Sequence, residues 1–305
     1  MNSYSYISRK WLNFLQSVLI MAVMSGMLGL LGWLIAGSIG VLWAFFTGGT
    51  VLLASSLFSA WPMVLRMYNA RFLSPEQAPE LYSILLQISR KAGLYRNPAL
   101  FYIPGPAINA FSVGNRKNPV IAVTQGLLRS LNSREIRAVL AHEVSHIRNN
   151  DIRIMTIADA VSRLTALLAL GGQILLFINL PLILMQGYHV SWWIIAVLVL
   201  APTMSTIMQL ALSRTREFAA DMDAAMITSD PMGLAQALTK LEYHSVDWIM
   251  GILRPGKKPD IPSVLRTHPK TKDRINRLIA LSRDMDKGSA NLISNRPETR
   301  VLISR

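Results

Sequence analysis

Two long stretches of this chain contain no Asp, Glu, Lys or Arg: residues 11–65 and residues 164–213. A helix needs about 20 predominantly apolar residues to cross a bilayer, so each stretch is long enough for two crossings. Residues typical of turns divide each stretch, at 36–40 in the first and at Pro181 and 186–189 in the second. The pattern predicts an α-helical membrane protein with four transmembrane helices in two hairpins.

The basic residues predict the orientation of these helices. All 31 Lys and Arg residues lie outside the two charge-free stretches, and two hairpins would leave them on one side. The positive-inside rule makes that side the cytoplasm, so we expect a multi-pass protein of a bacterial-type inner (plasma) membrane with cytoplasmic termini. A net charge of +14 can also indicate nucleic-acid binding, but no recognition motif accompanies it. We therefore expect contacts with membrane lipid and no nucleic acid.

The two hairpins divide the chain into five parts. We expect an N-terminal transmembrane hairpin at 1–66, a cytoplasmic segment at 67–155, a second transmembrane hairpin at 156–213, a second cytoplasmic segment at 214–287 and a loosely ordered tail at 288–305. The two cytoplasmic segments together have the length of one ordinary domain.

The first cytoplasmic segment has a mixed pattern. A helical pattern at 75–92 is followed by three short runs with the composition of strands, at 99–103, 108–113 and 119–123. Residues typical of turns separate these runs. The segment therefore predicts a small, partly antiparallel sheet, and hence an α+β domain, before the helix that begins near Ser133.

That helix contains the sequence HEVSH, in which His142 and His146 are four residues apart. On a helix both imidazoles leave the same face, which suits two ligands of a tetrahedral zinc ion. Glu143 lies close enough to take a proton from water without ligating the metal. An ordinary amphipathic helix with a chance histidine spacing is the alternative. The chain has no cysteine, so histidine and carboxylate groups must supply the zinc ligands.

A second acidic motif, SRTREFAAD, begins at Ser213, the last residue of the second charge-free stretch. Helical spacing places Glu217 and Asp221 on one face. We expect Glu217 to be the third zinc ligand and Asp221 to accept a hydrogen bond from the distal nitrogen of a ligating histidine. The alternative is a juxtamembrane face of ion pairs that includes Arg214 and Arg216.

The remaining histidines give weaker signals. His189 falls in the second expected turn and suits a membrane interface, whereas His244 follows an apolar helical pattern and suits packing or the surface. His268 precedes a proline and a basic helical pattern that contains Arg274 and Arg277. His268 either marks this helix boundary or belongs to the site.

These motifs together resemble those of the HtpX-like membrane zinc metalloproteases, which are gluzincins related to the C-a-a-X prenyl proteases. The resemblance covers nearly the whole chain. It includes Asn109-Ala110-Phe111, HEVSH followed by Asn149 and Asp151, SRTREFAAD and THPKTKDRI. The family usually has glycine where this chain has Asn150. Asparagine also tolerates the left-handed conformation that ends many helices, so we expect the site to be intact.

The resemblance implies a zincin-type catalytic domain made of the two cytoplasmic segments. It implies that zinc is bound by His142, His146 and Glu217, that Glu143 is the general base, and that zinc-bound water attacks the peptide bond. Further site residues implied or suggested are Asp151 and Asp221 as supports of the ligands, Asn109, Ala110 and Phe111 as a substrate-binding strand, and His268 as an oxyanion-stabilising group.

The implied substrates are proteins or peptides, in particular membrane or misfolded proteins, cleaved at the cytoplasmic face in protein quality control or a stress response. Two alternatives remain open from the sequence. One is a site-specific processing protease for a dedicated, prenyl-peptide-like substrate. The other is a non-enzymatic membrane scaffold that retains the fold, and the intact Glu143 argues against it.

Overall fold

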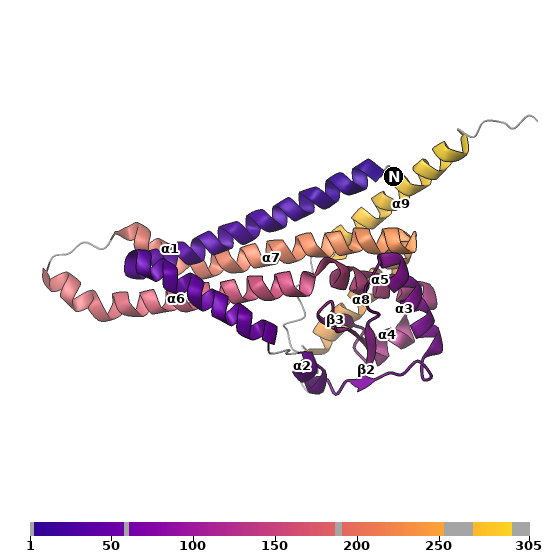
Figure 1. Ribbon diagram of the computed structural model, residues 1–305, viewed down its shortest axis with the longest axis horizontal. Coiled ribbons are helices and arrows are strands. Elements are labelled where there is room, and N and C mark those ends of the chain that lie inside the picture. The colour runs from indigo at the N-terminus through magenta and orange to yellow at the C-terminus, as the bar shows by residue number, and fades with distance from the viewer. Residues whose placement is uncertain (1–2, 58–60, 187–190, 253–270, 295–305) are drawn as a thin grey trace, which may run out of the picture.

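The protein has an elongated helical part and a compact mixed part (Figure 1). The computed structural model describes residues 3–57, 61–186, 191–252 and 271–294. The elongated part is formed by α1 (Ser3–Leu57), α6 (Asp151–Gln186) and α7 (Trp192–Thr228), which pack on one another. The first half of α1 begins at the end of the molecule that carries the compact part.

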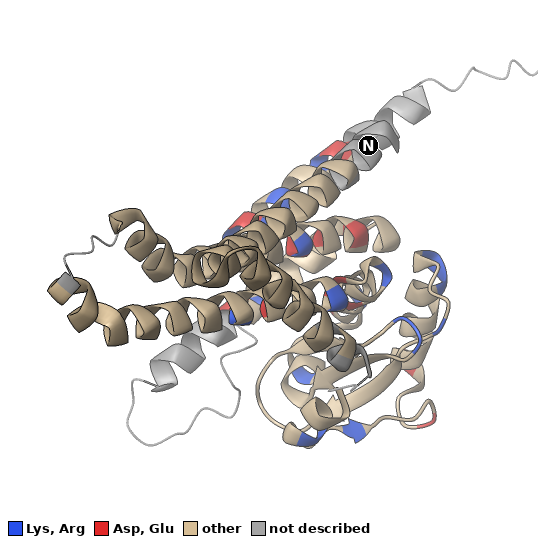
Figure 2. Cartoon of the chain, turned by 60° about the vertical axis from the view of Figure 1, so that its left-hand side comes forward, with Lys and Arg blue, Asp and Glu red and all other residues tan. Residues whose placement is uncertain are grey.

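Within the described residues, three helices are long and apolar enough to cross a membrane, over Trp11–Val51, Asp151–Met185 and Trp192–Thr228. Figure 2 shows that the parts of these helices farthest from the mixed part are free of charged residues. Their outer surfaces expose large apolar side chains, and the Phe177 side chain, for example, is 77% exposed. A surface of this kind is stable in lipid, which supports the prediction of a membrane protein.

The first membrane segment is interrupted at Ala36 and Gly37, where the backbone leaves the helical conformation. Gly37 has a φ of 58°, which glycine adopts without strain. A Cβ atom on Gly40 would overlap the backbone of Gly32, so the two halves of α1 meet closely beside the break. The chain folds back at this point (Figure 1), where the sequence predicted a turn.

The predicted turn at Pro181 is wrong, because α6 continues through this residue to Gln186. Proline removes one helical hydrogen bond, but membrane helices tolerate it where the freed carbonyl finds another partner. The rest of the predicted turn, including His189, lies outside the described residues. α6 and α7 also cross the expected boundaries at 155 and 213 without a break.

The mixed part contains a four-stranded sheet with the order β1-β2-β4-β3. Its strands are β1 (Arg71–Phe72), β2 (Ala99–Ile103), β3 (Ala110–Gly114) and β4 (Pro119–Thr124). β2 and β4 are parallel, whereas the β1–β2 and β3–β4 pairs are antiparallel. The three predicted strands are present, and β1 was too short to recognise. β3 lies at one edge of the sheet.

Helices cover both faces of this sheet. On one face, α3 (Pro79–Ala92) and α5 (Ser133–Asn149) form the main core with the end of α7, α8 (Pro231–Ile252) and α9 (Thr271–Ser294). Fully buried side chains in this core include Leu85, Leu100, Ile121, Leu140 and Leu278. On the other face lies α2 (Trp61–Met67), and α4 (Gln125–Ser130) follows β4 directly.

Several element boundaries differ from the prediction, and β3 covers Ala110–Gly114 instead of 108–113. α3 begins at Pro79, because residues 75–78 form a turn in which the Ala78 N–H donates to the Ser74 carbonyl. α9 runs to Ser294, seven residues into the expected tail. Residues 253–270, which include His268, and residues 295–305 lie outside the described residues.

Candidate metal centre

The two ends of α5 hold the HEVSH segment in place. At its start, the Asn132 side chain accepts from the Glu135 N–H and the Glu135 side chain accepts from the Asn132 N–H, both at 2.9 Å. This reciprocal capping confirms the predicted helix start. At its end, Asn150 has a φ of 59°, the left-handed conformation expected for it. The chain turns there, and α6 begins at once with Asp151.

The predicted zinc ligands come together from two helices. α5 supplies His142 and His146, whose Nε2 atoms are 3.1 Å apart. α7 supplies Glu217, whose Oε2 lies 3.3 Å from Nε2 of His142 and whose Oε1 lies 3.6 Å from Nε2 of His146. One ligand atom from each residue lies within 4.8 Å of the other two. The three groups therefore converge on a single point.

The other ring nitrogen of each histidine faces a carboxylate. Nδ1 of His142 lies 3.0 Å from Oδ1 of Asp221, and Nδ1 of His146 lies 2.8 Å from Oδ2 of Asp151. A carboxylate that accepts from Nδ1–H fixes the ring orientation and leaves the lone pair on Nε2. Both residues that were expected to support the ligands thus lie where such a hydrogen bond forms.

Two buried arginines hold these carboxylates. Nε of Arg216 donates to Oδ1 of Asp151 at 2.6 Å. Arg274 donates to both oxygens of Asp221, at 2.7 and 2.6 Å, and its Nη1 lies 3.1 Å from Oε2 of Glu217. The side chains of both arginines are less than 10% exposed. The juxtamembrane face of ion pairs that the sequence offered as an alternative is therefore partly present. Its Arg216, however, contacts a residue of the candidate site.

Sequence reasoning missed the roles of these arginines for different reasons. Arg216 is adjacent to Glu217, so its position was visible, although its contact with Asp151 was not. Arg274 lies 53 residues beyond Asp221, and only the packing of α9 against α7 and α8 brings it into the site. No local pattern distinguishes it from a surface arginine. Arg277, one turn further along α9, stacks 3.7 Å from the ring centroid of Phe218 on α7.

The charges around the histidines favour a divalent cation. Four buried carboxylates lie around the histidines, and two buried guanidinium groups offset only part of their charge, so negative charge is in excess. The carboxylates belong to Glu143, Asp151, Glu217 and Asp221, and the guanidinium groups belong to Arg216 and Arg274. Burial alone would lower the pKa of His142, but hydrogen bonds with Asp221 and Glu217 raise it to about 10. The acidic surroundings that favour a proton on this ring equally favour a metal cation at Nε2.

Glu143 is buried beside His142 on α5 and is 7% exposed. Its negative charge helps to raise the pKa of Arg274. Burial opposes the charged form of Arg274, but Asp221, Glu217 and Glu143 together raise its pKa above the ordinary value. Glu143 therefore adds a negative charge to the same buried cluster.

The strand proposed for substrate has its side chains on the two faces of the sheet. Asn109 precedes β3, and its N–H donates to Oγ1 of Thr124 at 2.9 Å. Ala110 packs toward the α5 side, whereas the Phe111 ring lies 5.6 Å from the ring of Tyr68 on the α2 side. The outer edge of β3 therefore presents mainly backbone groups.

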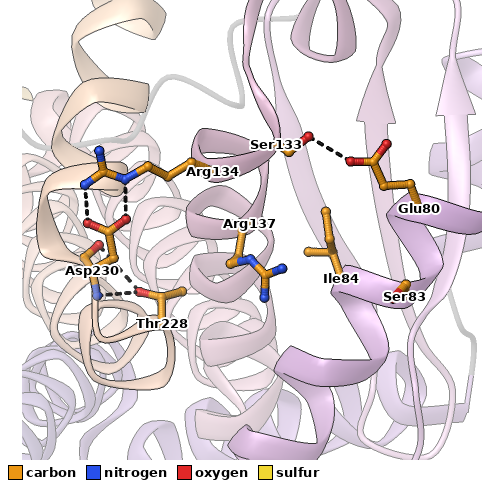
Figure 3. Close-up of a pocket in the computed structure, with 8 residues that line it drawn as sticks. All are labelled: Glu80, Ser83, Ile84, Ser133, Arg134, Arg137, Thr228 and Asp230. Atoms are coloured by element: carbon orange, nitrogen blue, oxygen red, sulfur yellow. Dashed lines mark hydrogen bonds and ion pairs between the residues drawn. The ribbon is translucent and has the colours of Figure 1, made fainter.

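A separate cavity of ≈ 510 Å³ lies at the start of α5 (Figure 3). Arg134 forms a double hydrogen bond with Asp230 on one side of it, and Ser133 donates to Glu80 on the other. Its lining residues include none of the converging histidines or carboxylates. These contacts join α5 to α3 and to the start of α8, so they stabilise the helix that carries the histidines.

The family described as "Peptidase family M48" matches residues 75–282, more than half of the chain. The fold and the site thus belong to a metalloprotease, and the chain is a member of peptidase family M48. A "Protease HtpX homolog" from Persephonella marina is 35% identical, with 89% of this chain and 98% of that protein covered. Another from Pyrococcus furiosus is 36% identical, with 88% and 95% covered. The predicted resemblance is confirmed.

One solved structure also matches part of this chain. The crystal structure of S. mikatae Ste24p matches with a TM-score of 0.46 and 20% identity, and the match covers 89% of this chain and 66% of that chain.

Proposed function

We propose that this metalloprotease is a zinc-dependent, membrane-bound endopeptidase that cleaves membrane or misfolded proteins at the cytoplasmic face. The observation that carries the proposal is the convergence of His142, His146 and Glu217. Their Nε2 and carboxylate atoms point at one another, while the other ring nitrogen of each histidine faces a carboxylate.

The donor set fits zinc. Zinc takes imidazole nitrogen and carboxylate oxygen, and a site with three protein ligands keeps a fourth position open for catalysis. The excess of buried carboxylates around the histidines matches the charge of a divalent ion. When bound, zinc would polarise the scissile carbonyl and lower the pKa of a water molecule.

The residues of the chain supply the remaining chemistry. Glu143, beside the ligands, would accept the proton from the attacking water and pass it to the leaving amine. Arg274 holds one oxygen of Glu217 and both oxygens of Asp221, so it positions a ligand and the support of a ligand. His268 remains our candidate for a group that stabilises the oxyanion, although it lies outside the described residues.

The substrate would bind in an extended conformation along β3. This strand is at the edge of the sheet, and it packs against α5, which carries the histidines. Backbone N–H and C=O groups at a sheet edge pair with an added strand of almost any sequence. Such pairing would suit an enzyme that acts on many damaged proteins, and the segment Asn109–Phe111 would be its centre.

We further propose four membrane spans with a cytoplasmic site. The break at Ala36 and Gly37, which divides α1, supports two spans within Ser3–Leu57. The start of α1 and the mixed part lie at the same end of the molecule. A cysteine introduced at Lys117, in a chain without native cysteine, should resist an impermeant thiol reagent applied to intact cells. Labelling from outside would overturn this topology.

The function is tested by a pair of variants of the full chain, purified in detergent. Glu143→Gln should retain zinc, because the residue is no ligand in our scheme, and lose peptide hydrolysis by about 10²–10⁴-fold. His142→Ala should lose both zinc and hydrolysis. A Glu143→Gln protein that cleaves at the wild-type rate, with contaminating proteases excluded, would refute the mechanism. Mapping the cleavage sites in several membrane proteins then separates broad quality control from site-specific processing.

A further inference from the structure

The segment that follows the first membrane helix carries an apolar surface that the metal centre does not use. We define the α2 surface as Met63 and Met67 of α2 together with Phe72 of β1. These side chains are 68%, 64% and 57% exposed. Met63 and Met67 are four residues apart, so they share one face of the helix. The three residues lie within a short segment of the chain, and several exposed large apolar side chains in one segment indicate contact with a partner or a membrane.

The opposite side of α2 is fixed to the sheet. Leu65 is 4% exposed and packs with Val120 and Ala122 of β4, and Trp61 and Tyr68 join this cluster. α2 is therefore packed on the sheet and is not a loose extension of α1. Its inner face is part of a small core, and its Met63–Met67 face is turned away from the sheet.

The position of α2 identifies the partner as lipid. Trp61 comes only four residues after Leu57, so at the full reach of the chain the two lie no more than about 14 Å apart. Figure 1 shows α2 on the side of the mixed part that is nearest the returning half of α1. Arg66 and Arg71 are exposed beside the apolar side chains. Apolar groups bordered by basic ones suit the boundary between acyl chains and anionic headgroups.

We propose that the α2 surface inserts into the interfacial layer of the phospholipid bilayer, with Arg66 and Arg71 at the headgroups. The consequence concerns β3. Tyr68, at the end of α2, lies 5.6 Å from Phe111 of β3 between ring centroids. The lipid contact therefore fixes the height of this edge strand above the membrane. The height of β3 matters for substrate binding only if β3 receives substrate, and this step alone rests on the proposed function.

The depth of the α2 surface is directly measurable because the chain has no cysteine. Single cysteines at Met63 and Met67 would carry a nitroxide label in the full chain, reconstituted in phosphatidylcholine–phosphatidylglycerol vesicles. Frequent collisions of the label with oxygen indicate that it lies in lipid, and frequent collisions with a nickel chelate indicate that it lies in water. Matched controls are Tyr95, which is 93% exposed between α3 and β2, and Phe177, which is 77% exposed on α6.

Labels at 63 and 67 should resemble the label at 177, with oxygen favoured over nickel, and should differ from the label at 95. Labels that resemble the one at 95 would overturn the proposal. Low collision rates with both reagents would mean that protein covers the surface, which also overturns it. With both methionines changed to glutamate, a label at Phe72 should shift toward water while the zinc content stays unchanged. An unshifted label would argue against insertion. None of these readouts requires protease activity.

Discussion

The two halves of α7, which form one continuous helix, differ in which side chains they expose and which they bury. From Trp192 to about Leu212 most of the exposed side chains are large and apolar, and the buried ones include the hydroxyl of Ser205. Beyond Ser213 the buried side chains include four charged ones, Arg216, Glu217, Asp221 and Asp223. The helix is about 55 Å long at 1.5 Å per residue, so it spans both environments.

The difference shows what each half depends on. In the first half, lipid accepts any apolar surface, so its structure depends on close packing of small residues such as Ala201 against Ala169 of α6. In the second half, every buried charge is costly unless it is paired. The structure of the site half therefore depends on specific ion-pair partners, Asp151 for Arg216 and Arg274 for Asp221. The structure of the membrane half depends on how well the helix surfaces fit together.

The largest expected effect breaks an ion pair of the site half. Arg274→Met should destabilise the protein by about 3–5 kcal/mol, because it leaves Asp221 buried without its cation. The matched control is Arg134→Met, at the pair with Asp230, where the Arg134 side chain is 53% exposed and the loss should be at most about 1 kcal/mol. Thermal unfolding by circular dichroism, with chelator present to remove metal effects, measures both. Equal losses of stability in the two variants would mean that burial does not determine how much each ion pair contributes to stability.

A smaller effect is expected from the membrane half. Ala201→Leu should cost about 1–3 kcal/mol, because Ala201 is 2% exposed where α6 and α7 meet and the larger side chain must displace its neighbours. Leu200→Ala, one residue away and 56% exposed, should change the stability little. Unfolding in mixed micelles with increasing sodium dodecyl sulfate compares the two. A costly Leu200→Ala would show that protein, and not lipid, covers that face.

The smallest effect concerns pH at the exposed pair. Hydrogen bonds from Arg134 lower the pKa of Asp230 most; partial burial opposes this, and the Gly233 N–H and the charge of Arg134 lower it further. A carboxyl with a lowered folded pKa stabilises the protein above its unfolded pKa, about 3.9, and this contribution disappears as the pH falls through the folded pKa. The stability difference between wild type and Asp230→Asn should therefore shrink below about pH 4. A difference that grows on acidification would contradict the sign.

Local spacing predicted the parts of the site that belong to one helix each. His142, Glu143 and His146 followed from HEVSH, and Glu217 with Asp221 from their four-residue spacing. The helix start near Ser133 and the left-handed Asn150 were equally local, and the structure confirms both. What the sequence did not predict depends on contacts between distant elements: the position of Arg274 on α9 and the contact of Arg216 with Asp151.

The fold was predictable to a similar depth. The charge-free stretches predicted membrane helices, and runs of β-branched and aromatic residues predicted β2, β3 and β4. Pro181 was misread as a turn because proline breaks helices in water far more often than in lipid. β1 has two residues and carries no alternation, so only its pairing with β2 reveals it.

The central claim is that α5 and α7 together build one zinc site, and the zinc content of Glu217→Ala tests it most directly. The full-length variant would be purified beside wild type and Glu242→Ala, an exposed glutamate of α8, and zinc would be measured after competition with a graded chelator. We predict one zinc per wild-type and Glu242→Ala chain, and a loss of high-affinity zinc in Glu217→Ala. Unchanged zinc affinity in Glu217→Ala would remove α7 from the metal site and contradict the account.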